Sequence, residues 1–183
     1  MAQSPTANIS GQVNLVSGDP FSGVDVVLLD DQGNQVAAVQ TDNNGAYLFA
    51  GIPTGVAYSL ALSSADNEPL NGVTTFDGVL IARHILGIQS LSTPYQIIAS
   101  DVNGSNTATT FDIVLIRRLV LGITQSLDIP HWRFVRADLA FPDLSQVFPV
   151  LQADNPGFIL AADFTRNYVA IKTGDVNGSA IAP

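Results

Sequence analysis

The chain has 183 residues, 46% of them hydrophobic, which is enough for one or two domains with hydrophobic cores. Its formal net charge is −9 with only seven lysine and arginine residues, which excludes nucleic-acid binding because that function needs clustered cations. Cysteine is absent, so disulfides, thiol catalysis and cysteine-ligated zinc are excluded as well. No stretch approaches the roughly 18 consecutive apolar residues of a membrane span, so no transmembrane segment is expected.

The first third of the chain is predicted to form an antiparallel β-sandwich. Short runs rich in β-branched and aromatic residues are separated by the turn clusters GDPFSG, DDQGN, TDNNG and IPTG. The predicted strands cover residues 9–16, 24–29, 35–40, 46–50 and 58–63. We therefore expect a first domain over residues 1–64, made of an N-terminal arm and the sandwich.

A duplicated unit follows the sandwich. Aligning residues 74–88 with residues 109–123 gives eleven identities in fifteen positions, which indicates two copies of one supersecondary unit. Each copy begins with the string TTFD and continues as an amphipathic segment that ends in Leu-Gly. This pattern predicts helices over residues 77–86 and 112–121, with glycine as the C-terminal cap.

The second copy is preceded by DVNGSNTATTFD, residues 101–112, called here the intact loop. Oxygen-bearing residues at positions 1, 3, 5, 7 and 12 of such a loop have the spacing that wraps ligands around Ca²⁺ before a helix begins. In this chain those positions are held by Asp101, Asn103, Ser105, Thr107 (through its carbonyl) and Asp112. Asn106 takes the tight-turn position, where asparagine tolerates a left-handed backbone.

The other copy of the loop is divided. Residues 71–77, the N-terminal half-loop, retain positions 6 to 12 and end at Asp77, whereas Leu70 at position 5 cannot bind a cation. DVNGS at residues 175–179, the C-terminal half-loop, supplies positions 1 to 5 about a hundred residues later. We expect these halves to rebuild a second Ca²⁺ site from Asp175, Asn177, Ser179, the Gly72 carbonyl and Asp77. A local site using Asp66, Glu68, the Gly72 carbonyl and Asp77 is the alternative.

The second domain is expected over residues 65–183, with a β insertion at about residues 128–172. Residues 132–135, 158–162 and 168–171 are predicted strands, and four prolines mark bends between them. The insertion is expected to cover the helix pair and to lead the chain to the C-terminal half-loop. Its aromatic residues are interpreted as core, with a sugar-binding surface as the less favoured alternative.

Two family resemblances accompany these motifs. Residues 8–63, from SGQV to YSLALS, resemble carboxypeptidase-regulatory-like and collagen-adhesin B-type domains, which implies an Ig-like or prealbumin-like sandwich of the kind used as stalks and spacers on cell surfaces. Residues 66–123 with 174–179 resemble the dockerin modules of secreted bacterial proteins, in permuted order. That resemblance implies two calcium ions, an extracellular or cell-surface location, and cohesin partners bound through the helices. Phe76 and Phe111 occupy a loop position where dockerins often carry small hydroxyl residues, and these phenylalanines are expected to enter the core.

The fold class predicted is mainly β with a small α part, namely the sandwich followed by a pair of calcium loop-helix motifs. No nucleophile motif surrounds either histidine, so an enzyme is not expected. The function predicted is a calcium-stabilised structural or adhesive module outside the cell. One form of this module is a self-assembling homo-oligomer or filament subunit, whose arm, residues 1–7, pairs with a neighbouring sheet. The alternative is a docking module for a cohesin-like protein partner, and a carbohydrate-binding module is a third reading.

Overall fold

The computed structural model describes residues 5–66 and 68–182, and the first four residues of the predicted arm lie outside this part. The five predicted N-terminal strands are present, and two of them run three residues further than expected, at the start of the first and the end of the fourth. They are β1 (Thr6–Leu15), β2 (Val24–Asp30), β3 (Gln35–Gln40), β4 (Ala46–Pro53) and β5 (Ala57–Ser64). The predicted insertion contributes β6 (Trp132–Arg136), β7 (Phe158–Ile159), β8 (Phe164–Thr165) and β9 (Tyr168–Lys172).

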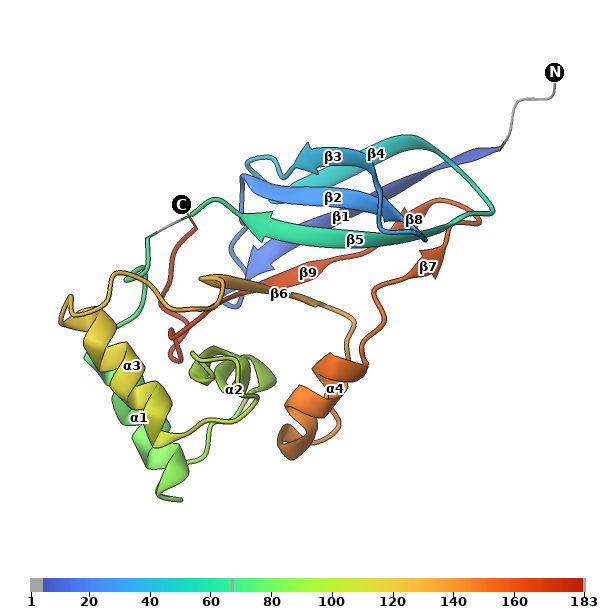
Figure 1. The fold of residues 1–183 in the computed structure, drawn as a ribbon. Coiled ribbons are helices and arrows are strands. Elements are labelled where there is room, and N and C mark those ends of the chain that lie inside the picture. Colours follow the sequence, from blue (N-terminus) through green and yellow to red (C-terminus); the bar gives the residue numbers. More distant parts are fainter. Residues whose placement is uncertain (1–4, 67, 183) are drawn as a thin grey trace.

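These strands form two sheets that face each other (Figure 1). One sheet has the order β4-β1-β9-β6, with β8 also paired to β1, and the other has the order β3-β2-β5-β7. Strands of the predicted insertion therefore complete both sheets of the N-terminal sandwich. The two segments on either side of the expected domain boundary, between residues 64 and 65, therefore contribute strands to the same two sheets.

Strands β8 and β9 run parallel to β1 in one register. Ile9 lies opposite Phe164, and Val13 lies opposite Tyr168, so the offset is the same for both pairings. Between them the Arg166 N–H donates to the Ser10 carbonyl at 2.9 Å, which continues the ladder across the gap. The two short segments thus act as one interrupted strand that ties the end of the chain to its beginning.

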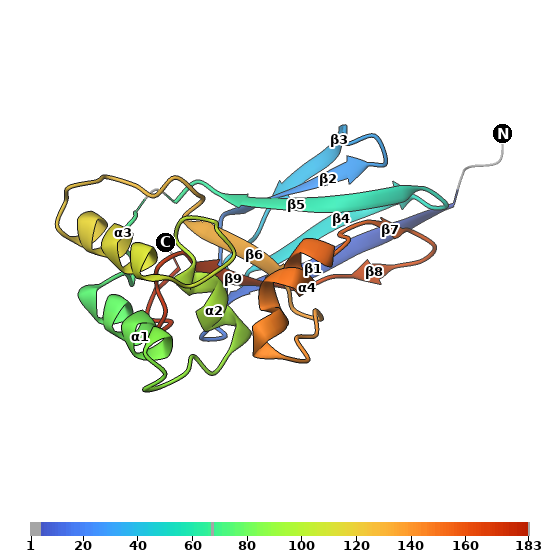
Figure 2. The ribbon, with the colours of Figure 1, turned by 60° about the horizontal axis from the view of Figure 1, so that its bottom comes forward.

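Side chains of β9 and β6 alternate between two hydrophobic cores. Tyr168 and Ala170 of β9, with Trp132 of β6, face the interior of the sandwich. Ile171 and Val135 face the opposite way and pack against the helices. Because successive residues of a strand point to opposite faces, this part of the sheet forms the middle layer of three (Figures 1 and 2).

The helix pair packs beneath this middle layer. Helix α1 (Thr75–Ile85) and helix α3 (Thr110–Val120) lie side by side and begin two residues before the predicted starts (Figure 1). Each begins with a capping box: Thr74 and Asp77 exchange hydrogen bonds at the start of α1, as Thr109 and Asp112 do at the start of α3. The carboxylate predicted at loop position 12 is therefore also the third residue of each helix.

Two further helices and a 3-10 turn were not predicted from the sequence. They are α2 (Pro94–Ser100), α4 (Val147–Ala153) and the turn η1 (Leu144–Gln146). The start of helix α2 could have been predicted from the sequence, because Thr93 and Gln96 form a capping box and Pro94 occupies the first helical position. Across residues 5–66 and 68–182, the helices are all too short or too polar to cross a membrane.

Candidate metal sites

The intact loop is organised around the Asp101 carboxylate. One oxygen, Oδ1, accepts a hydrogen bond from the Ser105 N–H at 2.9 Å, and the other, Oδ2, accepts one from the Asn106 N–H at 3.1 Å. The Asn103 side-chain oxygen also accepts from the Ser105 N–H, at 3.0 Å. Asn106 has a φ of 64°, the left-handed conformation that the sequence predicted for this turn.

The intact loop is closed by Asp112. Its Oδ1 atom accepts from the Val102 N–H at 3.0 Å, and its Oδ2 atom accepts from the Thr109 N–H at 2.8 Å. The Ser105 hydroxyl donates to the Thr107 carbonyl at 3.3 Å, within the same turn of the loop. The four side chains and the one carbonyl predicted as ligands therefore belong to a single hydrogen-bonded loop.

The C-terminal half-loop lies beside the start of α1, although the two are about a hundred residues apart in sequence (Figure 1). The Asp77 Oδ1 atom accepts from the Val176 N–H at 2.8 Å and from the Asn177 N–H at 3.1 Å. The Ser179 hydroxyl donates to the Gly72 carbonyl at 3.1 Å. All five residues of the predicted split site are thus brought together, Asp175 through its bonds within the half-loop.

The joined halves reproduce the hydrogen bonds of the intact loop. Asp175 Oδ1 accepts from the Ser179 N–H at 3.1 Å, and Asp175 Oδ2 accepts from the Ala180 N–H at 2.7 Å. In the intact loop, Asp101 accepts the corresponding bonds from the Ser105 and Asn106 N–H groups. Asn71 adds two bonds to the backbone of Ile181, one donated at 2.7 Å and one accepted at 3.1 Å. The chain end is therefore fixed on both sides of the loop junction.

Gly72 permits this close approach. A Cβ at this position would lie 2.5 Å from the Ala180 nitrogen and 2.7 Å from its Cα, and the backbone has a φ of 75°. We expect Gly72→Ala to lower the free energy of unfolding by more than the roughly 1–2 kcal/mol that a left-handed alanine costs, because the backbone of Ala180 must also move.

Gly87 provides the matched control for that substitution. Its φ is 68°, and a Cβ there meets no atom within 4 Å. Gly87→Ala therefore carries the same conformational cost without the clash. Urea unfolding of both variants separates the two effects, and equal losses in the two would show that the chain end is not held against Gly72.

The carboxylates of both loops are buried. Asp77, Asp101 and Asp112 are fully buried, and Asp175 is 5% exposed. Arg133 lies 3.5 Å from Asp101 Oδ2, so the intact loop has one positive neighbour. Within the described ranges, 5–66 and 68–182, neither Asp77 nor Asp175 forms an ion pair with lysine or arginine. Burial, together with the nearby Asp77 carboxylate, raises the pKa of Asp175 despite hydrogen bonds from Ala180 and Ser179.

The donor set of each loop consists of oxygen atoms only. Two carboxylates, one asparagine amide, one serine hydroxyl and one main-chain carbonyl are the hard ligands that calcium accepts. No group of three or more histidine, aspartate or glutamate side chains suited to a metal occurs in the part of the chain that the structure describes. The residues present thus fit a calcium loop with a low ligand charge, not a histidine-rich or carboxylate-rich centre.

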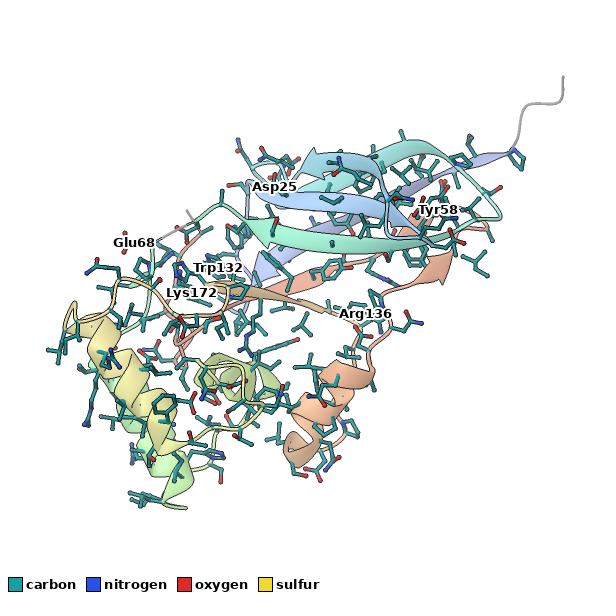
Figure 3. The ribbon with its side chains drawn as sticks, in the orientation of Figure 1. Asp25, Tyr58, Glu68, Trp132, Arg136 and Lys172 are labelled. Carbon is teal, nitrogen blue, oxygen red and sulfur yellow. The ribbon has the colours of Figure 1, made fainter. Side chains whose placement is uncertain are left out.

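The residues of the alternative local site have other contacts. The Asp66 Oδ2 atom accepts from the Trp132 indole N–H at 2.8 Å and lies 3.6 Å from the Lys172 ammonium. The Lys172 ammonium also donates to the Glu68 carbonyl at 2.6 Å and lies 5.0 Å from the centre of the Trp132 ring (Figure 3). Sequence reasoning missed this cluster, because the partners come from three distant segments.

Lys172 is the only lysine of the chain and is 3% exposed. Burial lowers its pKa, and the carboxylates of Asp66 and Asp175 oppose that change. The pKa of Asp66 is lowered overall, although burial by itself raises it, because the Glu68 N–H, the Trp132 indole and Lys172 favour its charged form. These shifts describe an ion pair that joins β9 to the segment leading into the N-terminal half-loop.

The interpretation of Phe76 and Phe111 as core residues is wrong. Their exposed fractions are 51% and 53%. Each is the second residue of its helix and lies on the solvent side of the helix pair, because the buried positions of α1 and α3 include Ile81 and Ile116. Both copies of the repeat therefore present an aromatic ring to solvent at the same position.

Residues 8–76 match the model of the carboxypeptidase regulatory-like domain family. The match begins within β1, includes β2 to β5, and confirms the resemblance to carboxypeptidase-regulatory-like domains stated for residues 8–63. The matched segment contributes strands to both sheets of the sandwich. Among curated proteins, no match was found.

Similar solved structures include three pilus proteins. The major pilin subunit BcpA of Bacillus cereus shares 23% identity, with 31% of this chain and 18% of that chain covered and a TM-score of 0.30. The C-terminal fragment of the pilus adhesin SpaC from Lactobacillus rhamnosus GG shares 12% identity (35% and 25% covered, TM-score 0.30). The group B streptococcus pilus 2b backbone protein shares 17% (35% and 29% covered, TM-score 0.28). The chain thus spans less than a third of the length of each of these proteins.

Proposed function

We propose that the chain binds two calcium ions, one in the intact loop and one between the two half-loops. The observation that carries this proposal is the matching of two hydrogen bonds, from Val102 to Asp112 at 3.0 Å and from Val176 to Asp77 at 2.8 Å. The same loop geometry is thus built once from continuous chain and once from two segments. Asp77 and Asp175 are two buried carboxylates that form no ion pair within residues 5–66 and 68–182, which supports a cation at the second position.

In this proposal the second calcium ion acts as a clamp. The C-terminal half-loop follows β9 after only two residues, and β9 is paired with β1 and β6. A cation held between Asp175 and Asp77 therefore joins the shared sheet to the helix pair. Because one ligand position carries serine in place of aspartate, the dissociation constant is expected in the range of extracellular modules, about 10⁻⁴ to 10⁻³ M. Such a site fills only outside the cell.

The function that follows is a non-catalytic structural or adhesive module of the cell surface, made rigid by calcium. Size-exclusion chromatography with light scattering tests it on the intact chain. In millimolar calcium we expect a smaller hydrodynamic radius than in chelator at equal mass, because the chain end is fixed only when the clamp is filled. An identical radius in both conditions would contradict a structural role for calcium. A calcium-dependent rise in mass would favour a self-assembling subunit over a monomeric spacer.

A docking module is the second candidate, and the exposed faces of α1 and α3, together with the residues just after each helix, favour it. Four pairs of repeat-related apolar residues are each at least 46% exposed. The pairs are Phe76 with Phe111, Val79 with Val114, Leu86 with Leu121, and Ile88 with Ile123. Exposed apolar groups of this size that recur at equivalent positions are typical of a surface that another protein covers. In the same light-scattering experiment, self-association lost in Phe76→Ser/Phe111→Ser would assign this face to a second copy of the chain.

A further inference from the structure

Both helices of the repeat present the same stripe of side chains to solvent. Successive members of each stripe are three, four and three residues apart, so they lie along one side of the helix. On α1 and its C-terminal cap the stripe consists of Phe76, Val79, Arg83 and Leu86. The aligned residues of α3 and its cap are Phe111, Val114, Arg118 and Leu121. All eight residues are exposed, and the two stripes are called the helix faces.

The exposed charge of α1 and α3 is positive. Arg83 and Arg118 lie within the stripes, and Arg117 is exposed beside one of them. Among the residues that the structure describes, none of these three arginines forms an ion pair. The acidic residues of the two helices, Asp77 and Asp112, are fully buried. Such helix faces favour a partner surface that is both apolar and acidic.

The outer face of the β3-β2-β5 sheet is apolar as well. Val26 and Leu28 of β2 point into the sandwich core, so the residues between and beside them point outward. The outward apolar residues of the three strands are called the sheet face and are Val27, Leu29, Val36, Ala38 and Ala61. Within residues 5–66 and 68–182, none of them packs against either hydrophobic core. Because the solvated face of an antiparallel sheet is normally polar, this surface also lacks a partner.

The charged residues around the sheet face are acidic. All seven lysine and arginine residues of the chain lie at position 83 or later, so strands β1 to β5 contain none. Asp25 points outward on β2, whereas Asp30 and Asp31 lie at the end of β2 and in the turn after it. The sheet face is therefore complementary in charge to the helix faces and shares their apolar character.

The helix faces and the sheet face lie on opposite sides of the molecule (Figures 1 and 2). The helix pair forms one outer layer and the β3-β2-β5 sheet forms the other, with β9 and β6 between them. The two surfaces are thus kept apart within one chain. Contact between unlike surfaces of two chains is heterologous, and it leaves one free surface of each kind on the resulting pair.

We propose that the helix faces of one copy of the chain dock on the sheet face of the next copy. This inference deepens the docking role of the helix faces and rests on it. Apolar contact between the two surfaces excludes water, and the arginines meet the aspartates that border the sheet face. Because each added copy supplies a new free surface, mass rises with protein concentration instead of stopping at a dimer. Added salt weakens the association.

Light scattering of the intact chain in calcium, over a series of protein concentrations, measures this association. Ala38→Lys places a cation at an exposed position of the sheet face, where it repels the arginines of the incoming helix faces. We expect it to weaken the association about 10-fold or more. Ala50→Lys is the matched control, because Ala50 is an exposed residue of β4, in the other sheet. The same substitution there should leave the association unchanged.

A mixture of two defective variants tests the head-to-tail arrangement. Phe76→Ser/Phe111→Ser damages the helix faces and Ala38→Lys damages the sheet face, so each variant alone is expected to be monomeric. Together they should form a one-to-one pair, because the sheet face of the first variant accepts the helix faces of the second. A symmetric contact between helix faces predicts instead that Ala38→Lys associates as strongly as the unchanged chain.

The proposal is overturned by an unchanged chain that stays monomeric at every concentration, or by an association that Ala38→Lys leaves intact. A mixture of the two variants without a one-to-one pair contradicts it as well. If Phe76→Ser/Phe111→Ser abolishes the association and Ala38→Lys does not, the helix faces still dock on a second copy, and only the sheet face is excluded. The number of bound calcium ions is measured separately by titration, so failure here is distinguishable from failure of the calcium clamp.

Discussion

Asp175→Ala is expected to lower the free energy of unfolding in calcium by about 1.5–3 kcal/mol. A ligand that binds only the folded state stabilises it by RT ln(1 + [L]/Kd), which is about 1.4–2.7 kcal/mol when free calcium exceeds Kd about 10- to 100-fold. Removal of Asp175 takes the first ligand from the second site and also the acceptor of the Ser179 and Ala180 N–H groups. Urea unfolding in about 10 mM calcium measures the loss.

The same comparison in chelator gives a much smaller difference. Without calcium the unchanged chain must hold the Asp175 and Asp77 carboxylates close together in a buried place, and their repulsion is relieved when one of them is removed. The loss of two backbone hydrogen bonds then opposes the gain. The signature of the clamp is therefore a stability loss that depends on calcium.

Asp42→Ala is the matched control for Asp175→Ala. The Asp42 carboxylate accepts from the Asn44 N–H at 2.8 Å and from the Ala46 N–H at 2.9 Å, which is the same number of backbone bonds in a turn of the sandwich. Its removal should cost the same with calcium and with chelator. If Asp175→Ala behaves like Asp42→Ala, the C-terminal half-loop is an ordinary turn.

Lys172→Met is expected to lower the free energy of unfolding by about 3–5 kcal/mol, the usual cost of removing one partner from a buried ion pair. Methionine keeps most of the side-chain volume, so the loss of charge is isolated from a loss of packing. Asp66, whose side chain is 8% exposed, would retain only its hydrogen bonds from Trp132 and Glu68. Denaturant unfolding with a fixed calcium concentration is the measurement.

The double variant Lys172→Met/Asp66→Asn tests that reasoning. Asparagine removes the unpaired charge but keeps an oxygen for the Trp132 indole, so the double variant should recover much of the stability lost in Lys172→Met. Such recovery is a coupling energy between the two residues. Additive losses in the double variant would mean that the lysine stabilises the fold by packing rather than by its charge.

The local elements of this fold could be predicted from the sequence. Turn clusters such as TDNNG and alternating β-branched residues located all five N-terminal strands, and the duplicated TTFD strings located the starts of α1 and α3 within two residues. The pairing of the C-terminal half-loop with Asp77 also followed from matching loop positions. In each case the signal lies within about twelve residues or in a repeated string.

The long-range pairings and contacts could not be predicted from the sequence. Nothing in the short segments around Phe164 and Tyr168 specifies a parallel pairing with β1, because strand partners are chosen by the packing of whole layers. The same applies to Asp66, Trp132 and Lys172, which meet only after the sheets form. Phe76 and Phe111 were misjudged because an aromatic residue beside a helix start was assumed to be buried, whereas α1 and α3 bury their opposite side.

The central claim is that two distant half-loops form one calcium site. Isothermal titration of the intact chain and of Asp175→Ala with calcium tests it most directly. We predict two bound ions for the unchanged chain and one for the variant, with the intact loop retaining its affinity. Two ions bound to Asp175→Ala, or none bound to the unchanged chain at millimolar calcium, would contradict the account.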